Sequence, residues 1–270
     1  METGLIVWGN NWKFLSENSK LSKKRRVLFM TNLFGEFFGT MVLCLFGCGV
    51  VANCLLSKSK AEGSGWLTIV TGWAMAVMLG AFTAISAGAP QADLNPAVTF
   101  AKTFLGVYEP GHAIMTMLAE IAGGVAGAAI VWLAFLPHWE VTEDKGIKLG
   151  VFCTAPAIRN TFANLLCEII ATAALVIMIF AIFSKPVGSL APGFGPYLVG
   201  MLVWALGLSL GGPTGYALNP ARDLGPRIAH AILPIAGKGG SDWGYAWIPV
   251  VGPLAGAGVA VVVAKAAGIL

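Results

Sequence analysis

The tripeptide Asn-Pro-Ala occurs twice in the chain, as Asn95-Pro96-Ala97 and as Asn219-Pro220-Ala221. Asparagine is a preferred N-cap residue, and proline is favoured at the first helical position because its missing N–H would have no partner there. Each triplet therefore predicts the start of a helix. The asparagine amides also offer N–H donors to a passing oxygen atom. The chemistry that these triplets predict is non-covalent: hydrogen bonding to a polar, uncharged molecule.

We expect membrane-spanning helices to hold these triplets in place. The 270 residues are 57% hydrophobic and 11% charged, whereas a soluble domain carries about 25% charged residues. A helix of about 20 apolar residues crosses a bilayer. The sequence predicts six spans, at residues 28–54, 66–87, 112–136, 161–183, 195–210 and 245–267.

The net charge of +4 is attributed to membrane topology and not to a nucleic-acid partner. A basic cluster precedes the first predicted span and consists of Lys20, Lys23, Lys24, Arg25 and Arg26. Lysine and arginine near the end of a span remain on the cytoplasmic side. We therefore expect residues 1–27 to form a disordered or interfacial cytoplasmic tail. Six spans return the C-terminus to the same side, as in a multi-pass protein of the plasma membrane.

An internal repeat relates the two halves of the chain. Glu36-Phe-Phe-Gly-Thr40 in the first span corresponds to Glu168-Ile-Ile-Ala-Thr172 in the fourth, and each segment precedes one Asn-Pro-Ala triplet. The predicted halves are residues 28–140 and 161–270, joined by an extracellular loop at 141–160. Each half has three spans, an odd number, so the two halves cross the membrane in opposite directions.

The segments that follow the triplets are too short and too interrupted to cross a bilayer. Irregular backbone at membrane depth is tolerated only where protein buries it or where it lines a water-filled cavity. We therefore expect two half-helices that enter from opposite faces and meet at their N-termini. Each N-terminus carries an effective charge of about +0.5, so the meeting point opposes cations and protons but accepts a neutral hydroxyl group or water.

Over residues 30–268 the sequence resembles the major intrinsic proteins, which are the aquaporins and glycerol facilitators. The resemblance is carried by Leu94-Asn-Pro-Ala-Val-Thr99, by Gly215-Tyr-Ala-Leu-Asn-Pro-Ala-Arg-Asp-Leu-Gly-Pro-Arg227 and by the segment that begins at Glu36. It implies an all-α membrane protein with an aquaporin-like right-handed bundle: six transmembrane helices and two half-helices in two inverted repeats. It also implies a homotetramer in the lipid bilayer that works without a cofactor.

The resemblance implies a selectivity filter of four residues. They are Arg222, Tyr216, Gly207 and an aromatic residue of the second span, which we assign to Trp73; a count back from Asn95 gives Thr71 as the alternative. An arginine offers several N–H donors to adjacent hydroxyl groups and repels cations. The aromatic rings would face the carbon edge of a polyol, and Gly207 would leave room for it.

Other positions indicate which branch of this family the sequence is more similar to. Asp223 and Pro249 are typical of the glycerol-facilitator branch, whereas Tyr216 stands where phenylalanine is usual and adds a hydroxyl group to the filter. Asp93 replaces the histidine that usually precedes Leu-Asn-Pro-Ala, which puts an acidic group at the inner mouth of the pore. Glu120 replaces a commonly neutral amide, and the sequence leaves open whether it is protonated or paired.

Two classes of function remain. The first is a passive channel for glycerol and similar small uncharged solutes with water, or mainly for water, lactic acid or dihydroxyacetone. Glu36 and Glu168 would then accept hydrogen bonds from loop N–H groups and fix the half-helix loops. The second is an ion-coupled transporter that uses Glu36, Glu168, Glu120 or Asp93 as ion-binding groups. An enzyme is not expected, because the sequence contains no constellation of nucleophile, base and metal.

Overall fold

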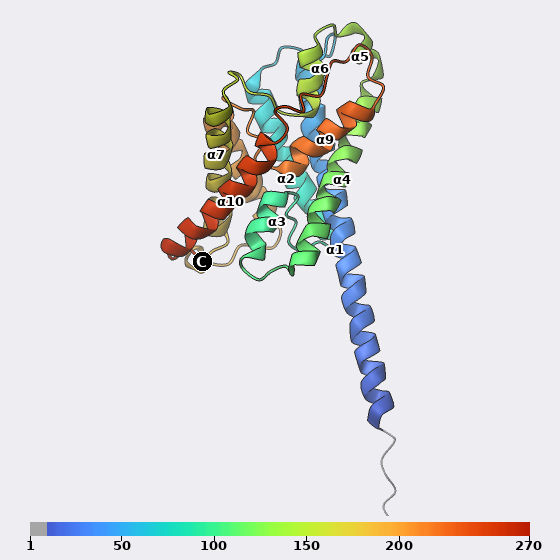
Figure 1. Cartoon of the computed structure of the whole chain (residues 1–270), viewed down its shortest axis with the longest axis vertical. Coiled ribbons are helices and arrows are strands. Elements are labelled where there is room, and N and C mark those ends of the chain that lie inside the picture. Colours follow the sequence, from blue (N-terminus) through green and yellow to red (C-terminus); the bar gives the residue numbers. More distant parts are fainter. Residues whose placement is uncertain (1–9) are drawn as a thin grey trace, which may run out of the picture.

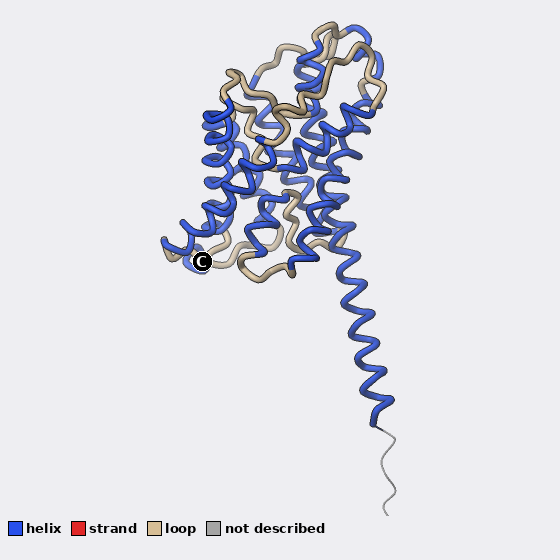
Figure 2. The backbone as a smooth tube through the Cα atoms, viewed as in Figure 1, coloured by secondary structure: helices blue, strands red, loops and turns tan. Residues whose placement is uncertain are grey.

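The chain folds into a bundle of helices, and no strand occurs in the described part (Figures 1 and 2). The structure is a computed structural model that describes residues 10–270, with side chains from residue 29 onward. The long helices are α1 (Asn10–Leu55), α2 (Trp66–Ser86), α4 (Pro110–Ala134), α7 (Thr161–Ile182), α8 (Phe194–Leu210) and α10 (Ile248–Ala266). The shorter ones are α3 (Pro96–Thr103), α5 (Leu136–Val141), α6 (Lys145–Phe152), the 3-10 helix η1 (Lys185–Val187) and α9 (Pro220–Ile232).

The protein is a multi-pass membrane protein, as predicted. Among the described residues, five helical segments are long and apolar enough to cross a membrane: Phe29–Leu55 within α1, and the whole of α2, α4, α7 and α10. The sixth predicted span is the apolar helix α8, which has 17 residues. At 1.5 Å per residue α8 is about 26 Å long, slightly less than a hydrocarbon core of about 30 Å.

Helix α1 differs from the prediction at its N-terminal end. It begins at Asn10 and has 46 residues, or about 69 Å of helix, where the sequence predicted a disordered or interfacial tail over residues 1–27. Residues 1–9 of that tail lie outside the described residues. The N-terminal part of α1 projects beyond the bundle at the end where the C-terminus lies (Figure 1).

Small residues bring the long helices together in the same way in both halves. A side chain at Gly123 of α4 would collide with the carbonyl oxygen of Phe37 in α1. In the second half, a Cβ at Gly256 of α10 would lie 2.5 Å from the carbonyl oxygen of Ile169 in α7. Both glycines therefore allow backbones to approach closely, which is the usual device for helix contacts in a bilayer.

The two short helices α3 and α9 lie inside the bundle and complete the repeat. Helix α3 packs against α4 and α10, and α9 packs against α4, α6 and α10. In Figure 1, α3 lies toward the end that carries the C-terminus, and α9 lies nearer the opposite end with α5 and α6. Two short helices in opposite halves of the bundle are the arrangement expected of half-helices.

Candidate pore and its lining

The two half-helices begin at the two Asn-Pro-Ala triplets. The Asn95 Oδ1 atom accepts a hydrogen bond from the Ala97 N–H at 2.9 Å, and Pro96 is the first helical residue of α3. In α9, which begins at Pro220, the Asn219 Oδ1 atom accepts from the N–H groups of Ala221 at 2.9 Å and of the next residue at 3.2 Å. Both asparagines therefore act as N-caps.

Each asparagine amide also joins its half of the chain to the other half. The Asn95 Nδ2 atom donates to the Leu218 carbonyl at 3.0 Å, and the Asn219 Nδ2 atom donates to the Leu94 carbonyl at 2.6 Å. A side-chain amide has two N–H bonds. One of them is used across the repeat interface, so one per asparagine is left for a passing molecule. Both asparagines line the cavity described below.

Glu36 and Glu168 hold the loops that precede the half-helices. The two Glu36 carboxylate oxygens accept from the backbone N–H groups of the two residues directly before Asn95, at 3.0 and 2.9 Å. Glu168 binds the two residues before Asn219 in the same way, both at 3.0 Å. Both carboxylates are fully buried. These are the hydrogen bonds that the sequence predicted, and they match between the halves.

Backbone strain in these loops was not predicted from the sequence. Leu94 and Leu218 have φ values of 52° and 54°, and two residues earlier in each loop Ala92 and Tyr216 have values of 43° and 39°. Non-glycine residues in this region cost about 1–3 kcal/mol each and persist only where the surroundings fix them. The buried glutamates are such a constraint, because they bind the N–H groups of these loops.

A cavity of about 470 Å³ is lined by residues of both halves. Its polar lining includes Asn95, Asn219, Arg222, Asp93 and Lys102, and most of the remaining lining is aliphatic or aromatic. Asp93 and Lys102 belong to the α3 side, toward the end with the C-terminus, and we call this end the inner mouth. A mainly apolar cavity with a few polar groups is typical of a site for a small molecule.

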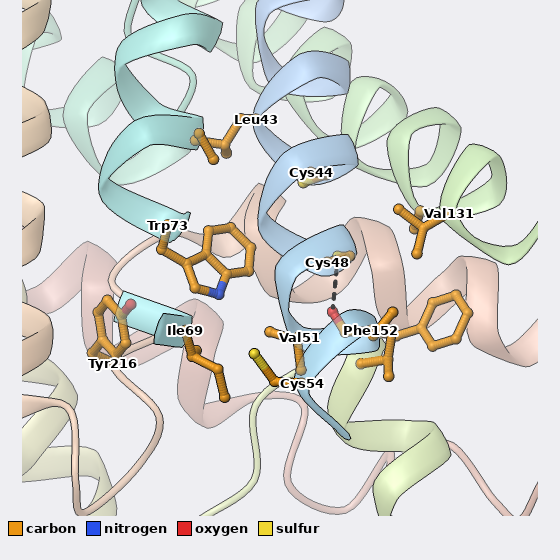
Figure 3. Packing of buried hydrophobic residues seen from close by; sticks show 14 of the residues in the cluster. Leu43, Cys44, Cys48, Val51, Cys54, Ile69, Trp73, Val131, Phe152 and Tyr216 are labelled. Atoms are coloured by element: carbon orange, nitrogen blue, oxygen red, sulfur yellow. Dashed lines mark hydrogen bonds between the residues drawn. The ribbon is translucent and has the colours of Figure 1, made fainter. Parts of the chain in front are cut away.

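Arg222 and Trp73, two of the residues predicted to form a filter, lie side by side on the wall of the cavity. The Arg222 Cζ atom lies 3.9 Å from the centroid of the Trp73 ring, and both residues line the cavity. The Arg222 side chain makes no hydrogen bond to the described part of the protein, so its N–H donors are available to the cavity. Figure 3 shows Trp73 and Tyr216 in the same region, with Ile69 of α2 beside them.

The structure distinguishes between the two alternatives in α2. The Thr71 hydroxyl donates to the Leu67 carbonyl of its own helix at 2.7 Å, and Thr71 does not line the cavity. Trp73 is 3% exposed and contributes its ring to the lining. Trp73 is therefore the α2 residue that faces Arg222.

Gly207 lies directly beside the Tyr216 ring. A Cβ there would lie 2.8 Å from Val70 Cγ1 and 3.0 Å from the Tyr216 Cζ atom. Gly207 therefore makes room for the Tyr216 ring. The Tyr216 hydroxyl is buried and has no hydrogen-bond partner in the described structure. The ring lines the cavity, whereas the hydroxyl group that we expected in the filter does not reach it.

Asp223 is also outside the cavity lining and belongs to a buried ion pair. Its Oδ1 atom accepts from Arg227 Nε and Nη2 at 3.0 and 2.8 Å. Its Oδ2 atom accepts from the backbone N–H and the hydroxyl of Thr154, both at 2.7 Å. Arg227 donates further to the carbonyls of Thr154, Ser241 and Asp242. The pair thus ties α9 to two outer loops, through partners that the sequence analysis did not identify.

At the inner mouth, Asp93 is paired and buried. Its Oδ1 atom forms an ion pair with Lys102 Nζ, and its side chain is 0% exposed. Its Oδ2 atom accepts a hydrogen bond from the Thr99 hydroxyl at 2.9 Å. The same hydroxyl lies 2.9 Å from Glu120 Oε1. Lys102 and Thr99 were not singled out from the sequence, although both lie within two turns of Asn95.

The described residues contain no cluster of three or more His, Cys, Asp or Glu side chains that could hold a metal ion.

Comparisons with known proteins agree with this geometry. The sequence profile of the family described as "Major intrinsic protein" matches residues 23–264. The chain is 49% identical over 227 residues to a probable glycerol uptake facilitator protein of Thermotoga maritima, covering 84% of this chain and 95% of that protein. It is 51% identical over 224 residues to glycerol uptake facilitator protein 3 of Lactiplantibacillus plantarum, covering 83% and 91%.

The fold is also similar to a solved structure. The X-ray structure of the aquaglyceroporin from Plasmodium falciparum matches with a TM-score of 0.76 over 88% of this chain and 96% of that one. The two sequences are 24% identical over the match. At this level of identity the comparison supports the arrangement of helices and half-helices alone.

Proposed function

The chain belongs to the major intrinsic protein family, and from this membership we propose that it is a passive channel for glycerol and similar small uncharged solutes, with water. Two relatives that are about half identical over most of the chain are glycerol uptake facilitators. The proposal rests chiefly on the Arg222–Trp73 pair, in which the Arg222 Cζ atom lies 3.9 Å from the centroid of the Trp73 ring on the wall of the cavity. Glycerol has the same two-sided character, with hydroxyl groups on one edge and carbon on the other.

The pore residues would act on the solute in turn. Arg222 donates hydrogen bonds to two adjacent hydroxyl groups, while the rings of Trp73 and Tyr216 contact the carbon edge. Beyond the filter, the remaining N–H donors of Asn95 and Asn219 bind the same hydroxyl oxygens. These bonds replace part of the hydration that the solute loses, which would otherwise cost about 1–3 kcal/mol for each buried polar group.

Ions would be excluded by charge and by the loss of hydration. The N-termini of α3 and α9 each contribute about +0.5 of a charge at the triplets, and Arg222 adds a full positive charge. Together they repel cations and protons. An anion would have to leave its water shell in a mainly apolar cavity, at a cost far above that for a neutral group.

The other predicted site residues would stabilise the walls of the pore and would not contact the solute. Glu36 and Glu168 would fix the loops, Gly207 would seat the Tyr216 ring, and Asp223 would hold the outer end of α9. Residues 28–140 and 161–270 would form the two inverted repeats, with 141–160 as the extracellular connection that contains α6.

We further propose that the protein lies in the plasma membrane with both termini in the cytoplasm. The C-terminus and the projecting part of α1 lie at the same end of the bundle (Figure 1), and the basic cluster before residue 28 favours the cytoplasmic side for that end. A homotetramer is the assembly that we expect from the family.

Light scattering by vesicles that contain the purified protein tests the channel. Under a glycerol gradient, glycerol entry should be faster than in empty vesicles, should not saturate, and should persist when proton and sodium gradients are collapsed. Saturable uptake that stops with either gradient would instead support the coupled transporter. A panel of glycerol, water, urea, dihydroxyacetone and lactic acid in the same vesicles would rank the solutes.

The filter itself is tested by Arg222→Lys, which keeps the charge but loses the planar set of donors. The loss of one hydrogen bond to a charged group is worth about 1.5 kcal/mol, so glycerol permeability should fall about tenfold. Glu143→Gln, at an exposed loop residue, is the matched control and should conduct normally. Unchanged permeability in Arg222→Lys would remove Arg222 from the filter.

A further inference from the structure

The Thr99 hydroxyl lies between two carboxyl groups. Its Oγ1 atom is 2.9 Å from Asp93 Oδ2 and 2.9 Å from Glu120 Oε1. A hydroxyl group has one proton and can donate one full hydrogen bond. If both carboxyl groups were ionised, the hydroxyl could donate to only one of them. The other carboxylate oxygen would then face the hydroxyl oxygen with no proton between them. One of the two carboxyl groups must therefore carry a proton and act as the donor to Thr99.

The surroundings of Asp93 indicate that it is the ionised member. It forms an ion pair with Lys102, whose other two donors are used by the backbone carbonyl and the side-chain oxygen of Gln91, at 3.2 and 3.0 Å. All three N–H donors of the ammonium group are thus engaged. Asp93 is compensated by a neighbouring cation, and it gains nothing from a proton of its own.

The surroundings of Glu120 indicate the opposite. Glu120 is 0% exposed, and its Oε2 atom has no hydrogen-bond partner within the described chain. An ionised carboxylate in this position would be a buried charge with half of its acceptors unpaired, which is far more costly than a neutral carboxyl group. A proton on Oε1 allows Glu120 to donate to Thr99, which then donates to Asp93.

The charged groups near Glu120 offer it no counter-ion. Glu36 of α1 and Asp93 are acids that would repel an ionised Glu120, and Lys102 of α3 is bonded to Asp93 and Gln91. Tyr108, before α4, is buried with a hydroxyl that lacks a partner in the described region; burial and the Asp93 charge raise its pKa, so it remains neutral.

Helices α4 and α9 add no compensating charge either. His112, two turns before Glu120 on α4, contacts Asn32 at 3.1 Å. Helix α9 also packs against α4, but there the contact is made by backbone and small residues such as Gly124 and Gly225. Its Asp223 and Arg227 are bonded to each other and to the outer loops, and its Arg222 guanidinium lies over the Trp73 ring.

We propose that Glu120 is a proton-binding site and that its proton holds Asp93 and Lys102 in place at the inner mouth of the pore. When the proton is lost, the Thr99 hydroxyl lies between two anions and can serve only one of them. The other carboxylate is repelled. Because Asp93 and Lys102 line the cavity, their displacement narrows it, and solute flux falls as the pH rises. This last step rests on the proposed channel function.

Infrared spectroscopy of the whole protein in vesicles tests the proton directly. The carbonyl band of a protonated carboxylic acid should be present at neutral pH, shift in D2O, and be lost in Glu120→Gln. The band should be unchanged in Glu143→Gln, which alters an exposed loop residue. A difference spectrum between the native protein and Glu120→Gln without such a band would overturn the proposal. So would a band that appears only when sodium is removed, because the site would then bind a cation.

The native protein alone provides a second measurement, which is independent of whether Glu120→Gln folds. As the pH is raised, the infrared band and the glycerol flux should decline together, and Glu120→Gln should lose this pH dependence. Flux that stays constant while the band disappears would overturn the coupling to the pore. Absence of glycerol flux at every pH, with the band present, would instead refute the proposed channel and leave the proton site standing.

Discussion

Four residues after its capping asparagine, α3 carries Thr99, whereas α9 carries Asp223. Up to this point the two half-helices match: both have an asparagine cap, a strained leucine and a glutamate that binds two loop N–H groups. At the outer half-site, which we define as Asp223, Arg227 and Thr154, one carboxylate receives four donors. At the inner half-site, Asp93, Thr99, Lys102 and Glu120, two carboxyl groups share one hydroxyl proton.

The repeat therefore fixes the backbone, while a few side chains give each end of the pore its own chemistry. Arg222 of α9 and Val98 of α3 occupy equivalent positions after the triplets. The outer end thus has a fixed positive charge and a closed ion pair. The inner end has an excess of carboxyl groups and one proton to share. The outer half-site should therefore contribute stability, and the inner one should respond to pH.

The largest effect that separates the two half-sites is expected from Asp223→Ala. It leaves the fully buried Arg227 guanidinium without its counter-ion, and the loss of one partner of a buried pair costs about 3–5 kcal/mol. Thermal unfolding of the detergent-solubilised protein should show a large drop in Tm or no folded protein. The repeat-equivalent change Thr99→Val should cost much less, since Glu120 and Asp93 lose only a shared neutral partner. Similar losses in both variants would mean that the half-sites do not differ in stability.

A smaller difference is expected between the two loop-holding glutamates. Either glutamine variant turns an N–H donor toward a backbone N–H, which costs about 1–3 kcal/mol. At Glu36 part of this cost is offset, because removal of its charge relieves repulsion with the nearby Asp93. Glu168→Gln should therefore lower the Tm more than Glu36→Gln does. The reverse order would show that Glu36 is not in a more acidic environment than Glu168.

Glycerol permeability should also be more sensitive to side-chain size at the outer end than at the inner end. A methyl group in Gly207→Ala lies 3.0 Å from Tyr216 Cζ, and overpacking of about 1–3 kcal/mol should push this ring toward the cavity. We expect glycerol permeability to fall about tenfold, with a smaller loss for water. Gly212→Ala is the control, since a Cβ there meets nothing within 4 Å. Equal losses of water and glycerol would exclude Gly207 from solute selection.

Local sequence rules predicted much of this structure. The Asn-Pro pairs predicted the starts of α3 and α9, because capping depends on a few adjacent residues. The repeat between Glu36 and Glu168 predicted the carboxylates beneath the two loops. The family resemblance placed Trp73, Tyr216 and Arg222, and all three line the cavity.

The parts that could not be predicted depend on contacts between distant segments. Thr154 reaches Asp223 from a loop 69 residues away, and no sequence rule pairs them. From the sequence, Lys102 is only a basic residue near the end of a helix. The fold brings it next to Asp93. The orientation of the Tyr216 hydroxyl follows from φ at Tyr216 and from the room at Gly207, neither of which can be read from residue type.

The smallest effect is expected at the rim of the outer end, where Arg159 pairs with Asp242 and lies 5.4 Å from the Tyr245 ring centroid. The hydrogen bond and the charge of Asp242 raise the Arg159 pKa, so this guanidinium stays charged. The Arg159 side chain is nevertheless 57% exposed, and exposed pairs contribute at most about 1 kcal/mol. Arg159→Gln should lower the Tm slightly, and less at high salt, because exposed charges are screened. A loss that approaches that of Asp223→Ala would mean that the rim, and not the buried pair, stabilises the outer end.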